Sequence, residues 1–159
     1  MNLFWIFQLG VKEMRDKHSK ILVVDDEEKY REVYKTLLTE NGYKVITAAS
    51  SQKAISIIKK ERVNLVLLDL ILPEVNGIEV LKKTKSKFGN SVEVIMVTGY
   101  GSIDSAVKAM KHGAFSYFVK SHDPDTLLLE IEKAEKMNLL LKVNKNLKKQ
   151  LKNNQYLLE

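Results

Sequence analysis

Five side chains suited to metal or phosphoryl chemistry directly follow short apolar runs in this sequence of 159 residues. They are Asp25, Asp26, Asp69, Thr98 and Lys120. Neighbouring carboxylates repel one another unless a cation lies between them, and oxygen ligands without His or Cys suit Mg²⁺. A carboxylate can also take up a phosphoryl group, with a hydroxyl and an ammonium as donors to the phosphoryl oxygens. Each side chain alone could cap a helix or face solvent, but the five together favour this chemistry.

The apolar runs alternate with amphipathic stretches, and this alternation predicts the elements that position the five side chains. Each run is apolar almost throughout, as in strands buried on both faces, whereas the stretches between them have apolar residues at helical spacing. A parallel α/β sheet with helices on both faces is therefore expected, and ligands bind at the carboxyl ends of such strands. The predicted strands are 20–24, 43–48, 64–68, 92–97 and 114–119, and the predicted helices are 27–40, 50–61, 75–87, 102–112 and one from about 125.

Four segments carry a family pattern when they are taken together. They are Val-Val-Asp-Asp-Glu at 23–27, Leu-Asp-Leu-Ile-Leu-Pro-Glu-Val-Asn-Gly at 68–77, Met-Val-Thr-Gly-Tyr-Gly at 96–101 and Gly-Ala-Phe-Ser-Tyr-Phe-Val-Lys at 113–120. With these segments the sequence resembles the receiver domain of two-component response regulators. The resemblance implies a flavodoxin-like fold with five parallel strands in the order 2-1-3-4-5.

The resemblance covers residues 19–136, which are expected to form the receiver domain. Residues 1–18 would then be an N-terminal extension, and residues 137–159 a helical linker that continues the fifth helix. Residues 97–114 resemble the NtrC-like subgroup, whose members add an ATPase acting on sigma-54 polymerase and a DNA-binding helix-turn-helix. Transcriptional regulation is the expected output, although the sequence contains no G-x-x-x-x-G-K-S/T phosphate loop. A receiver of a hybrid sensor kinase and an output-less phosphorelay protein are the alternatives.

The resemblance also implies the roles of the site residues. Asp69 is expected to accept a phosphoryl group from a histidine kinase, and Thr98 and Lys120 are expected to bind the phosphoryl oxygens. Such a domain catalyses only its own phosphorylation and dephosphorylation, so the chain is expected to be a signalling protein and not an enzyme. Mg²⁺ is the expected cofactor, and its expected ligands are Asp25, Asp26, Asp69 and the backbone carbonyl of Ile71.

Tyr117 lies three residues before Lys120 and matches the aromatic switch position of the family. When Thr98 moves toward the phosphoryl group, this ring is expected to turn inward and to remodel the face formed by the fourth helix, the fifth strand and the fifth helix. A half-buried strand aromatic without a switching role is equally compatible with the sequence. Gly77 matches the loop glycine of the family and is expected to need a positive φ.

Two departures from the family pattern affect the site. The family usually has Pro after the Lys, with a cis peptide bond before it, but this chain has Ser121. A cis bond without Pro costs about 2.5–4 kcal/mol, so a trans bond is expected. Ile71 and Tyr100 flank the phosphoryl position, and neither can orient a water molecule for attack, so self-dephosphorylation is expected to be slow. Ile71 also argues against a haloacid dehalogenase-type phosphatase, which needs a second Asp there.

The last helix is expected to continue to the end of the sequence, because neither Gly nor Pro follows residue 125. Leu127, Ile131 and Ala134 are expected to pack on the sheet. Beyond them, apolar residues recur at alternating spacings of three and four residues and form a seam along the helix. Asn144 lies at heptad position a of this seam, where a buried Asn favours a parallel homodimer. The dimer is expected to use the switch face as well. A solvated, partly frayed helix is the other interpretation. The seam consists of Met137, Leu140, Asn144, Leu147, Leu151, Asn154 and Leu158.

The formal net charge of +6 is concentrated in this tail, where residues 137–159 carry five Lys and one Glu. The tail has neither Arg nor a recognition motif, so no direct nucleic-acid binding is expected. The absence of Cys excludes disulfides and thiolate metal sites. The apolar run 3–7 is too short to span a bilayer, and Met14 is a candidate true start, so a cytoplasmic protein without a membrane segment is expected.

Overall fold

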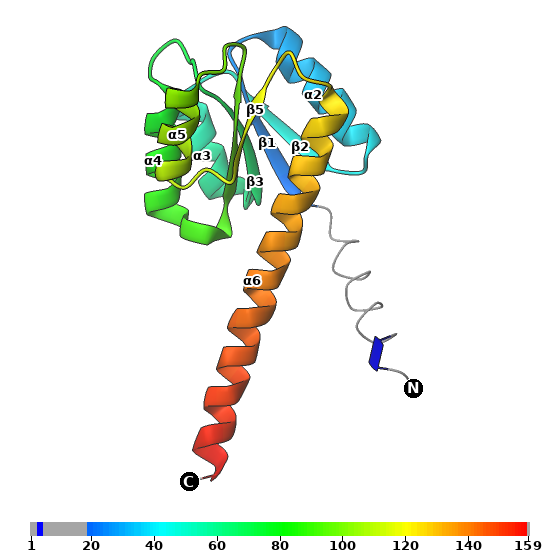
Figure 1. Cartoon of the computed structure of the whole chain (residues 1–159), viewed down its shortest axis with the longest axis vertical. Coiled ribbons are helices and arrows are strands. Elements are labelled where there is room, and N and C mark those ends of the chain that lie inside the picture. The colour runs from blue at the N-terminus through cyan, green and yellow to red at the C-terminus, as the bar shows by residue number, and fades with distance from the viewer. Residues whose placement is uncertain (1–2, 5–18, 159) are drawn as a thin grey trace.

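In the computed structural model, which describes residues 3–4 and 19–158, a five-stranded parallel sheet lies between two layers of helices (Figure 1). The strand order β2-β1-β3-β4-β5 confirms the predicted fold class. The strands are β1 (Lys20–Val24), β2 (Lys44–Ala48), β3 (Leu65–Asp69), β4 (Glu93–Thr98) and β5 (Ser116–Val119). The helices are α2 (Glu28–Glu40), α3 (Ser51–Glu61), α4 (Gly77–Phe88), α5 (Ile103–Lys111) and α6 (Pro124–Leu158), with a 3-10 turn η1 (Gly89–Ser91) after α4.

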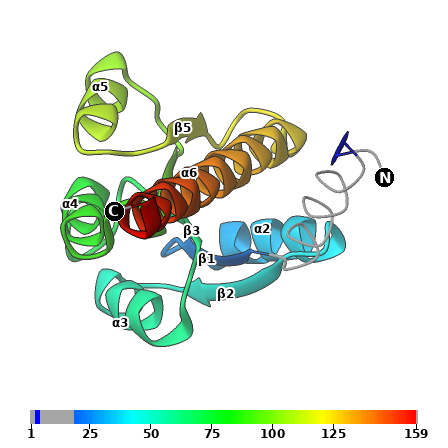
Figure 2. The ribbon, with the colours of Figure 1, turned by 90° about the horizontal axis from the view of Figure 1, so that it is seen from below.

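The strands are apolar almost throughout because both faces of the sheet are covered. Along β1, Leu22 and Val24 face a core shared with α3, α4 and α5, whereas Ile21 and Val23 face a second core shared with α2 and α6. Figures 1 and 2 show the same division, with α2 and α6 on one face and α3, α4 and α5 on the other. Because all five strands are parallel, their carboxyl ends lie at one edge of the sheet. We call it the carboxyl edge.

Two predicted elements begin two residues later than expected. The fifth strand begins at Ser116, because Gly113 turns the chain at a φ of +92° and the amide of Ala114 still bonds the α5 carbonyl of Ala109. Helix α4 begins at Gly77, because the side chain of Asn76 caps it by accepting a hydrogen bond from the amide of Ile78. The residues before these starts therefore belong to loops.

Gly77 corrects another expectation, because its φ is not positive. The residue is needed for close approach. A Cβ atom at this position would collide with the backbone carbonyl oxygen of Asp69 and would lie 2.9 Å from Cα of Leu70. The amide of Gly77 also donates to the carbonyl of Leu70 at 2.7 Å, which closes the loop after β3 against the start of α4.

Helix α6 has two different parts. Leu127, Ile131 and Ala134 are fully buried against the sheet, as predicted. Beyond them α6 projects away from the sheet (Figure 1). The seam side chains Met137, Leu140, Leu147 and Leu151 are exposed there, from 44% at Met137 to 66% at Leu151. The predicted helical extension is confirmed, whereas pairing of this seam with a second copy stays a prediction.

The N-terminal extension lies almost wholly outside the described residues, and so does Met14. Leu3 and Phe4 are helical and exposed. Among the helices described for residues 3–4 and 19–158, none is long and apolar enough to cross a bilayer.

Candidate functional site

The carboxyl edge brings together the side chains that the sequence placed after the strands. Asp25 follows β1, Asp69 and Thr98 end β3 and β4, and Lys120 follows β5. Asp25 is 2% exposed, Asp69 4% and Thr98 0%, so these polar groups lie in a site from which water is largely excluded. Asp26, by contrast, is exposed.

The ammonium of Lys120 forms ion pairs with both of the buried carboxylates, Asp25 and Asp69. Its Nζ lies 2.6 Å from Oδ2 of Asp25 and 3.1 Å from Oδ2 of Asp69. The exposed carboxylate of Glu27 is farther away, at 3.8 Å. The side chain of Lys120 is only 3% exposed, so the three charges form a buried network. A cation between the two carboxylates is what their mutual repulsion requires.

The other carboxylate oxygens are held by the backbone. Oδ1 of Asp25 accepts a hydrogen bond from the amide of Glu27 at 2.9 Å, and Oδ1 of Asp69 accepts one from the amide of Ile71 at 3.1 Å. The guanidinium of Arg31 donates to the carbonyls of Asp25 and Asp26 at 2.8 and 2.9 Å. The loop after β1 is thereby tied to α2, and each buried carboxylate has a fixed orientation.

Burial and charge have opposing effects on the ionisation of this network. The pKa of Asp69 is raised to about 6, chiefly by burial and also by the nearby Asp25, although the amide of Ile71 and the ammonium of Lys120 act to lower it. Burial lowers the pKa of Lys120, but its hydrogen bonds and attraction to Asp25 and Asp69 outweigh burial, and the pKa lies above its ordinary value. The ammonium therefore remains charged at neutral pH.

An acidic cluster suited to a metal ion lies beside this network. Asp25, Asp26 and Glu27 each offer a carboxylate oxygen, and the three oxygens lie within 4.8 Å of one another. The donors are all hard oxygens, and two of the three residues are exposed, so the cluster fits a cation such as Mg²⁺ that keeps part of its water shell. Sequence reasoning identified Asp25 and Asp26 but missed Glu27, although it directly follows them.

The hydroxyl of Thr98 forms its hydrogen bonds with the backbone and not with the carboxylates. It bonds the backbone of Tyr100, with the amide of Tyr100 donating to Oγ1 at 3.3 Å and Oγ1 donating to the carbonyl at 3.3 Å. The amide of Lys120 donates to the carbonyl of Thr98 at 2.7 Å, which fixes the end of β5 against β4. The expected trans bond before Ser121 agrees with the backbone, which has no cis peptide bond in its described part.

Tyr117 is half-buried on the face where α5 covers β5. Its hydroxyl lies 2.8 Å from Oγ of Ser105 on α5. The loop before α5 passes close to the same ring, because a Cβ atom at Gly101 would lie 2.8 Å from Cγ2 of Val119 and 3.7 Å from Cε1 of Tyr117. Ser105 is a contact that the sequence did not reveal, since it lies twelve residues from Tyr117 on another element.

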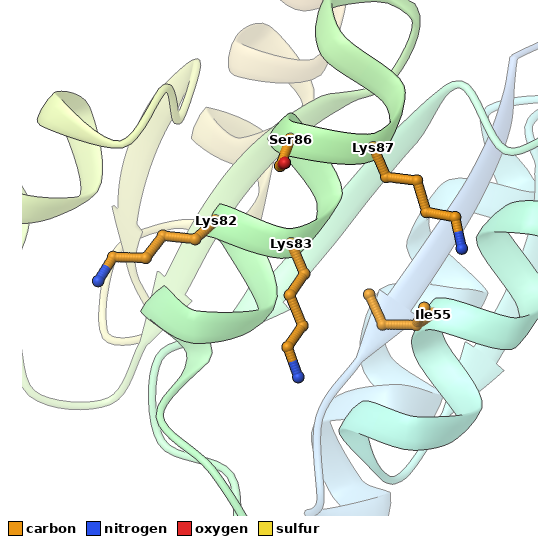
Figure 3. A pocket seen from close by; sticks show the side chains of 5 residues that line it. All are labelled: Ile55, Lys82, Lys83, Ser86 and Lys87. Atoms are coloured by element: carbon orange, nitrogen blue, oxygen red, sulfur yellow. The ribbon is translucent and has the colours of Figure 1, made fainter.

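A groove of about 430 Å³ lies elsewhere, between α3 and α4 (Figure 3). Figure 3 shows three lysine side chains extending from α4 around it, in different directions. None of its residues belongs to the carboxyl edge, so this groove is separate from the acidic site. It is lined by Ile55, Lys82, Lys83, Ser86 and Lys87.

Comparison with known proteins agrees with this geometry. Sporulation initiation phosphotransferase F of Bacillus subtilis (strain 168) is 38% identical over 127 residues, which are 80% of this chain and 98% of that protein. Transcriptional regulatory protein ZraR of Klebsiella oxytoca is 37% identical over 121 residues, which are 76% of this chain but only 27% of ZraR. A crystal structure of NtrX from Brucella abortus has 30% identity and a TM-score of 0.78, with 83% of this chain and 30% of that chain covered.

The family model of the response regulator receiver domain matches residues 21–132, which are most of the chain. The matched segment contains both the acidic cluster and the network around Lys120. Receiver domains generally bind Mg²⁺ at an acidic cluster of this kind and interact with histidine kinases. The chain belongs to the response regulator receiver domain family of two-component systems.

Proposed function

We propose that this receiver accepts a phosphoryl group on Asp69 from a histidine kinase and transmits the event through the face formed by α5, β5 and α6. The observation that carries the proposal is the position of Lys120, whose ammonium lies between the buried carboxylates of Asp25 and Asp69. An acceptor carboxylate must be near a cation that can also bind the incoming phosphoryl oxygens. Asp69 has such a cation at 3.1 Å.

The transfer exchanges one bond to phosphorus for another. An Oδ of Asp69 forms the new bond to phosphorus as the bond between phosphorus and the imidazole nitrogen of the kinase breaks. The imidazole leaves with the electron pair of that bond. Lys120 would donate to one phosphoryl oxygen, and the hydroxyl of Thr98 to another after it releases the backbone of Tyr100.

Asp25, Asp26, Asp69 and the carbonyl of Ile71 would hold Mg²⁺, with Glu27 close enough to join them. Bound there, the ion would offset the negative charge that accumulates between the carboxylates and the phosphoryl group. Lys120 remains the protein's own counter-charge beside the acceptor.

Two outputs are compatible with the relatives. ZraR is a transcriptional regulatory protein, and the NtrC-like pattern favours regulation of transcription through a dimer. The phosphotransferase of Bacillus subtilis favours a second candidate, in which Asp69 passes its phosphoryl group to another histidine, because the chain covers 98% of that protein.

The dimer would use exposed apolar side chains on α5 together with the seam of α6. Ile103 is 83% exposed, and Met110 is 50% exposed. On α6, Leu140 and Leu151 are 63% and 66% exposed on the part beyond the sheet. Sedimentation of the phosphorylated protein, with and without residues 137–159, tests this arrangement. A dimer that is lost on truncation supports it, and an unchanged monomer in both proteins refutes it.

The phosphoryl acceptor is tested by incubation with Mg²⁺ and a phosphorylated histidine kinase or the small donor phosphoramidate, followed by intact mass. The wild type is expected to gain one phosphoryl group, and Asp69→Asn none. Asp104→Asn is the matched control, because Asp104 is exposed in the first turn of α5 and belongs to neither the acidic cluster nor the network around Lys120. Equal labelling of wild type and Asp69→Asn would overturn the proposal.

The two outputs are distinguished by a second incubation. The phosphorylated protein is mixed with a histidine phosphotransfer domain, and the mass of both partners is followed. Loss of the phosphoryl group from this chain with a gain on the histidine supports the relay. Retention of the group together with dimer formation supports transcriptional output.

A further inference from the structure

The aromatic ring of Tyr30 lies against the ammonium of the key lysine. Nζ of Lys120 is 3.9 Å from the centroid of this ring. Tyr30 is in the first turn of α2, which starts at Glu28, directly after the acidic cluster. The cluster and the ring are therefore close in the sequence, whereas Lys120 follows β5 and is far from them in the sequence.

The ring occupies a side of the ammonium that the carboxylates leave open. Asp25 and Asp69 lie at 2.6 and 3.1 Å from Nζ, and each takes one of its three N–H groups. The carboxylate of Glu27 at 3.8 Å is exposed and provides a weak third contact. Since the side chain of Lys120 is only 3% exposed, water does not reach the remaining side. An ammonium near the face of an aromatic ring in a dry site is attracted by the ring's negative face.

The ring of Tyr30 is held in place by packing against a second tyrosine. Tyr30 stacks on Tyr34, with 6.1 Å between the ring centroids and 22° between their planes. Tyr34 is 3% exposed and belongs to the core beneath α2 and α6. The position of Tyr30 is therefore determined by the core, and an ordered ring can in turn restrict a flexible lysine side chain.

We propose that Tyr30 is a positioning residue for phosphorylation, whose ring holds the Lys120 ammonium beside Asp69 and shields it from water. The inference rests on the proposed acceptor role of Asp69. A lysine side chain has a flexible four-carbon chain and a strongly hydrated ammonium group. Without contacts that hold it, the ammonium therefore samples many positions. The ring limits those positions before the phosphoryl group arrives, which reduces the reorganisation needed in the transition state.

The ring's face, and not its bulk or its hydroxyl, carries the effect. Tyr30→Phe keeps the face and is expected to phosphorylate at the wild-type rate with phosphoramidate and Mg²⁺. Tyr30→Leu and Tyr30→Met keep an apolar side chain without a π face, and we expect rates about tenfold lower. Tyr43→Leu is the matched control, because Tyr43 is a half-buried tyrosine that bonds Glu135 and does not contact the site.

A second readout follows the position of the lysine without any phosphodonor. A proton held near the face of an aromatic ring resonates upfield, so the Hε protons of Lys120 are expected upfield in wild type and Tyr30→Phe. In Tyr30→Leu and Tyr30→Met, the Hε protons are expected near ordinary lysine shifts. In Tyr43→Leu they are expected to stay upfield, as in wild type. The Lys120→Met variant assigns the signal by removing it. Thermal unfolding of each variant verifies that it is folded.

The outcomes separate the two proposals. Slow phosphorylation in both Tyr30→Leu and Tyr30→Met, with rescue in Tyr30→Phe and loss of the upfield shift, supports the positioning role. Wild-type rates in folded Tyr30→Leu and Tyr30→Met, or equal slowing in Tyr43→Leu, overturn it. A wild type that takes up no phosphoryl group refutes the acceptor role of Asp69 instead, and the upfield shift is still measurable in that case.

Discussion

The hydroxyl of Tyr117 lies 2.8 Å from Oγ of Ser105, and this contact joins strand β5 to the beginning of helix α5. Ser105 is also part of the cap of that helix. Its amide donates to Oγ of Ser102 at 3.1 Å, and its own hydroxyl donates to the carbonyl of Ser102 at the same distance. The orientation of the expected switch residue is therefore linked to the end of the helix that it is expected to move.

The first prediction concerns this contact. Tyr117→Phe removes one hydrogen bond, and we expect it to lower the free energy of unfolding by about 1 kcal/mol. Ser105→Ala is expected to cost a similar amount or more, because it also removes the bond to Ser102. Since both variants remove the same contact, the double variant is expected to cost less than the two together in urea unfolding. Strict additivity would show that the two hydroxyls are not coupled.

The second prediction concerns the buried counter-charge. Lys120→Met leaves Asp25 and Asp69 buried without their ammonium, so we expect a loss of about 3 kcal/mol in metal-free buffer. Mg²⁺ is expected to restore more stability in this variant than in wild type, because a cation again lies near the carboxylates. Urea unfolding with EDTA and with Mg²⁺ measures both effects.

Lys133→Met is the control for this prediction, since Lys133 is 65% exposed and pairs with Glu130 at the surface. Lys133→Met is expected to lower the free energy of unfolding by less than about 1 kcal/mol, and Mg²⁺ is expected not to change this loss. Equal losses in Lys120→Met and Lys133→Met would contradict a buried ion network at the carboxyl edge.

The third prediction is a pH dependence remote from the site. Burial raises the pKa of Glu93 above its ordinary value, although the ammonium of Lys85, 3.6 Å away, lowers it. A raised pKa means that the folded state prefers the protonated acid. The stability contribution of Glu93 is therefore fully present below the ordinary pKa and is lost as the pH rises through the folded pKa.

Comparison with Glu93→Gln isolates this effect. Lys85 also donates to the carbonyls of Gly89 and Val92, so it keeps two hydrogen-bond partners in Glu93→Gln. We expect the stability of wild type relative to Glu93→Gln to fall as pH rises from about 4 to about 8. A relative stability that rises with pH would mean that the ion pair outweighs burial.

The fourth prediction concerns the lifetime of the phosphoryl group. Ile71 and Tyr100 are 61% and 85% exposed, and neither has a carboxylate or amide that can orient water. We expect the acyl phosphate to persist far longer than seconds in purified protein. Ile71→Asn introduces an amide, and loss of the group is expected to be about tenfold faster. A wild-type half-life of seconds, followed by intact mass, would contradict the prediction.

The sequence predicted the sheet and the residues of the carboxyl edge because these depend on local patterns, whereas the strand order followed from the resemblance to receiver domains. Apolar runs reveal buried strands, and a residue that ends a parallel strand must lie at one edge. Its errors were also local. The start of α4 depends on the cap that Asn76 supplies, and the role of Gly77 depends on the nearness of the Asp69 carbonyl.

The contacts that the sequence could not reveal join distant parts of the chain. Tyr30 and Lys120 meet because α2 begins and β5 ends at the same edge of the sheet, and each lies in or beside a helical or strand pattern that looks ordinary. Ser105 and Tyr117 meet because α5 packs on β5. In each case the partner depends on side-chain direction in three dimensions, which residue type and spacing do not specify.

The central claim is that Asp69 carries the phosphoryl group. The most direct measurement is borohydride reduction of the phosphorylated protein, which converts an aspartyl phosphate to homoserine, followed by peptide mass spectrometry. Homoserine at position 69 alone is the predicted result, with none in unphosphorylated protein. Homoserine at Asp25 or Asp26, or a phosphoryl gain without homoserine at position 69, would contradict the claim.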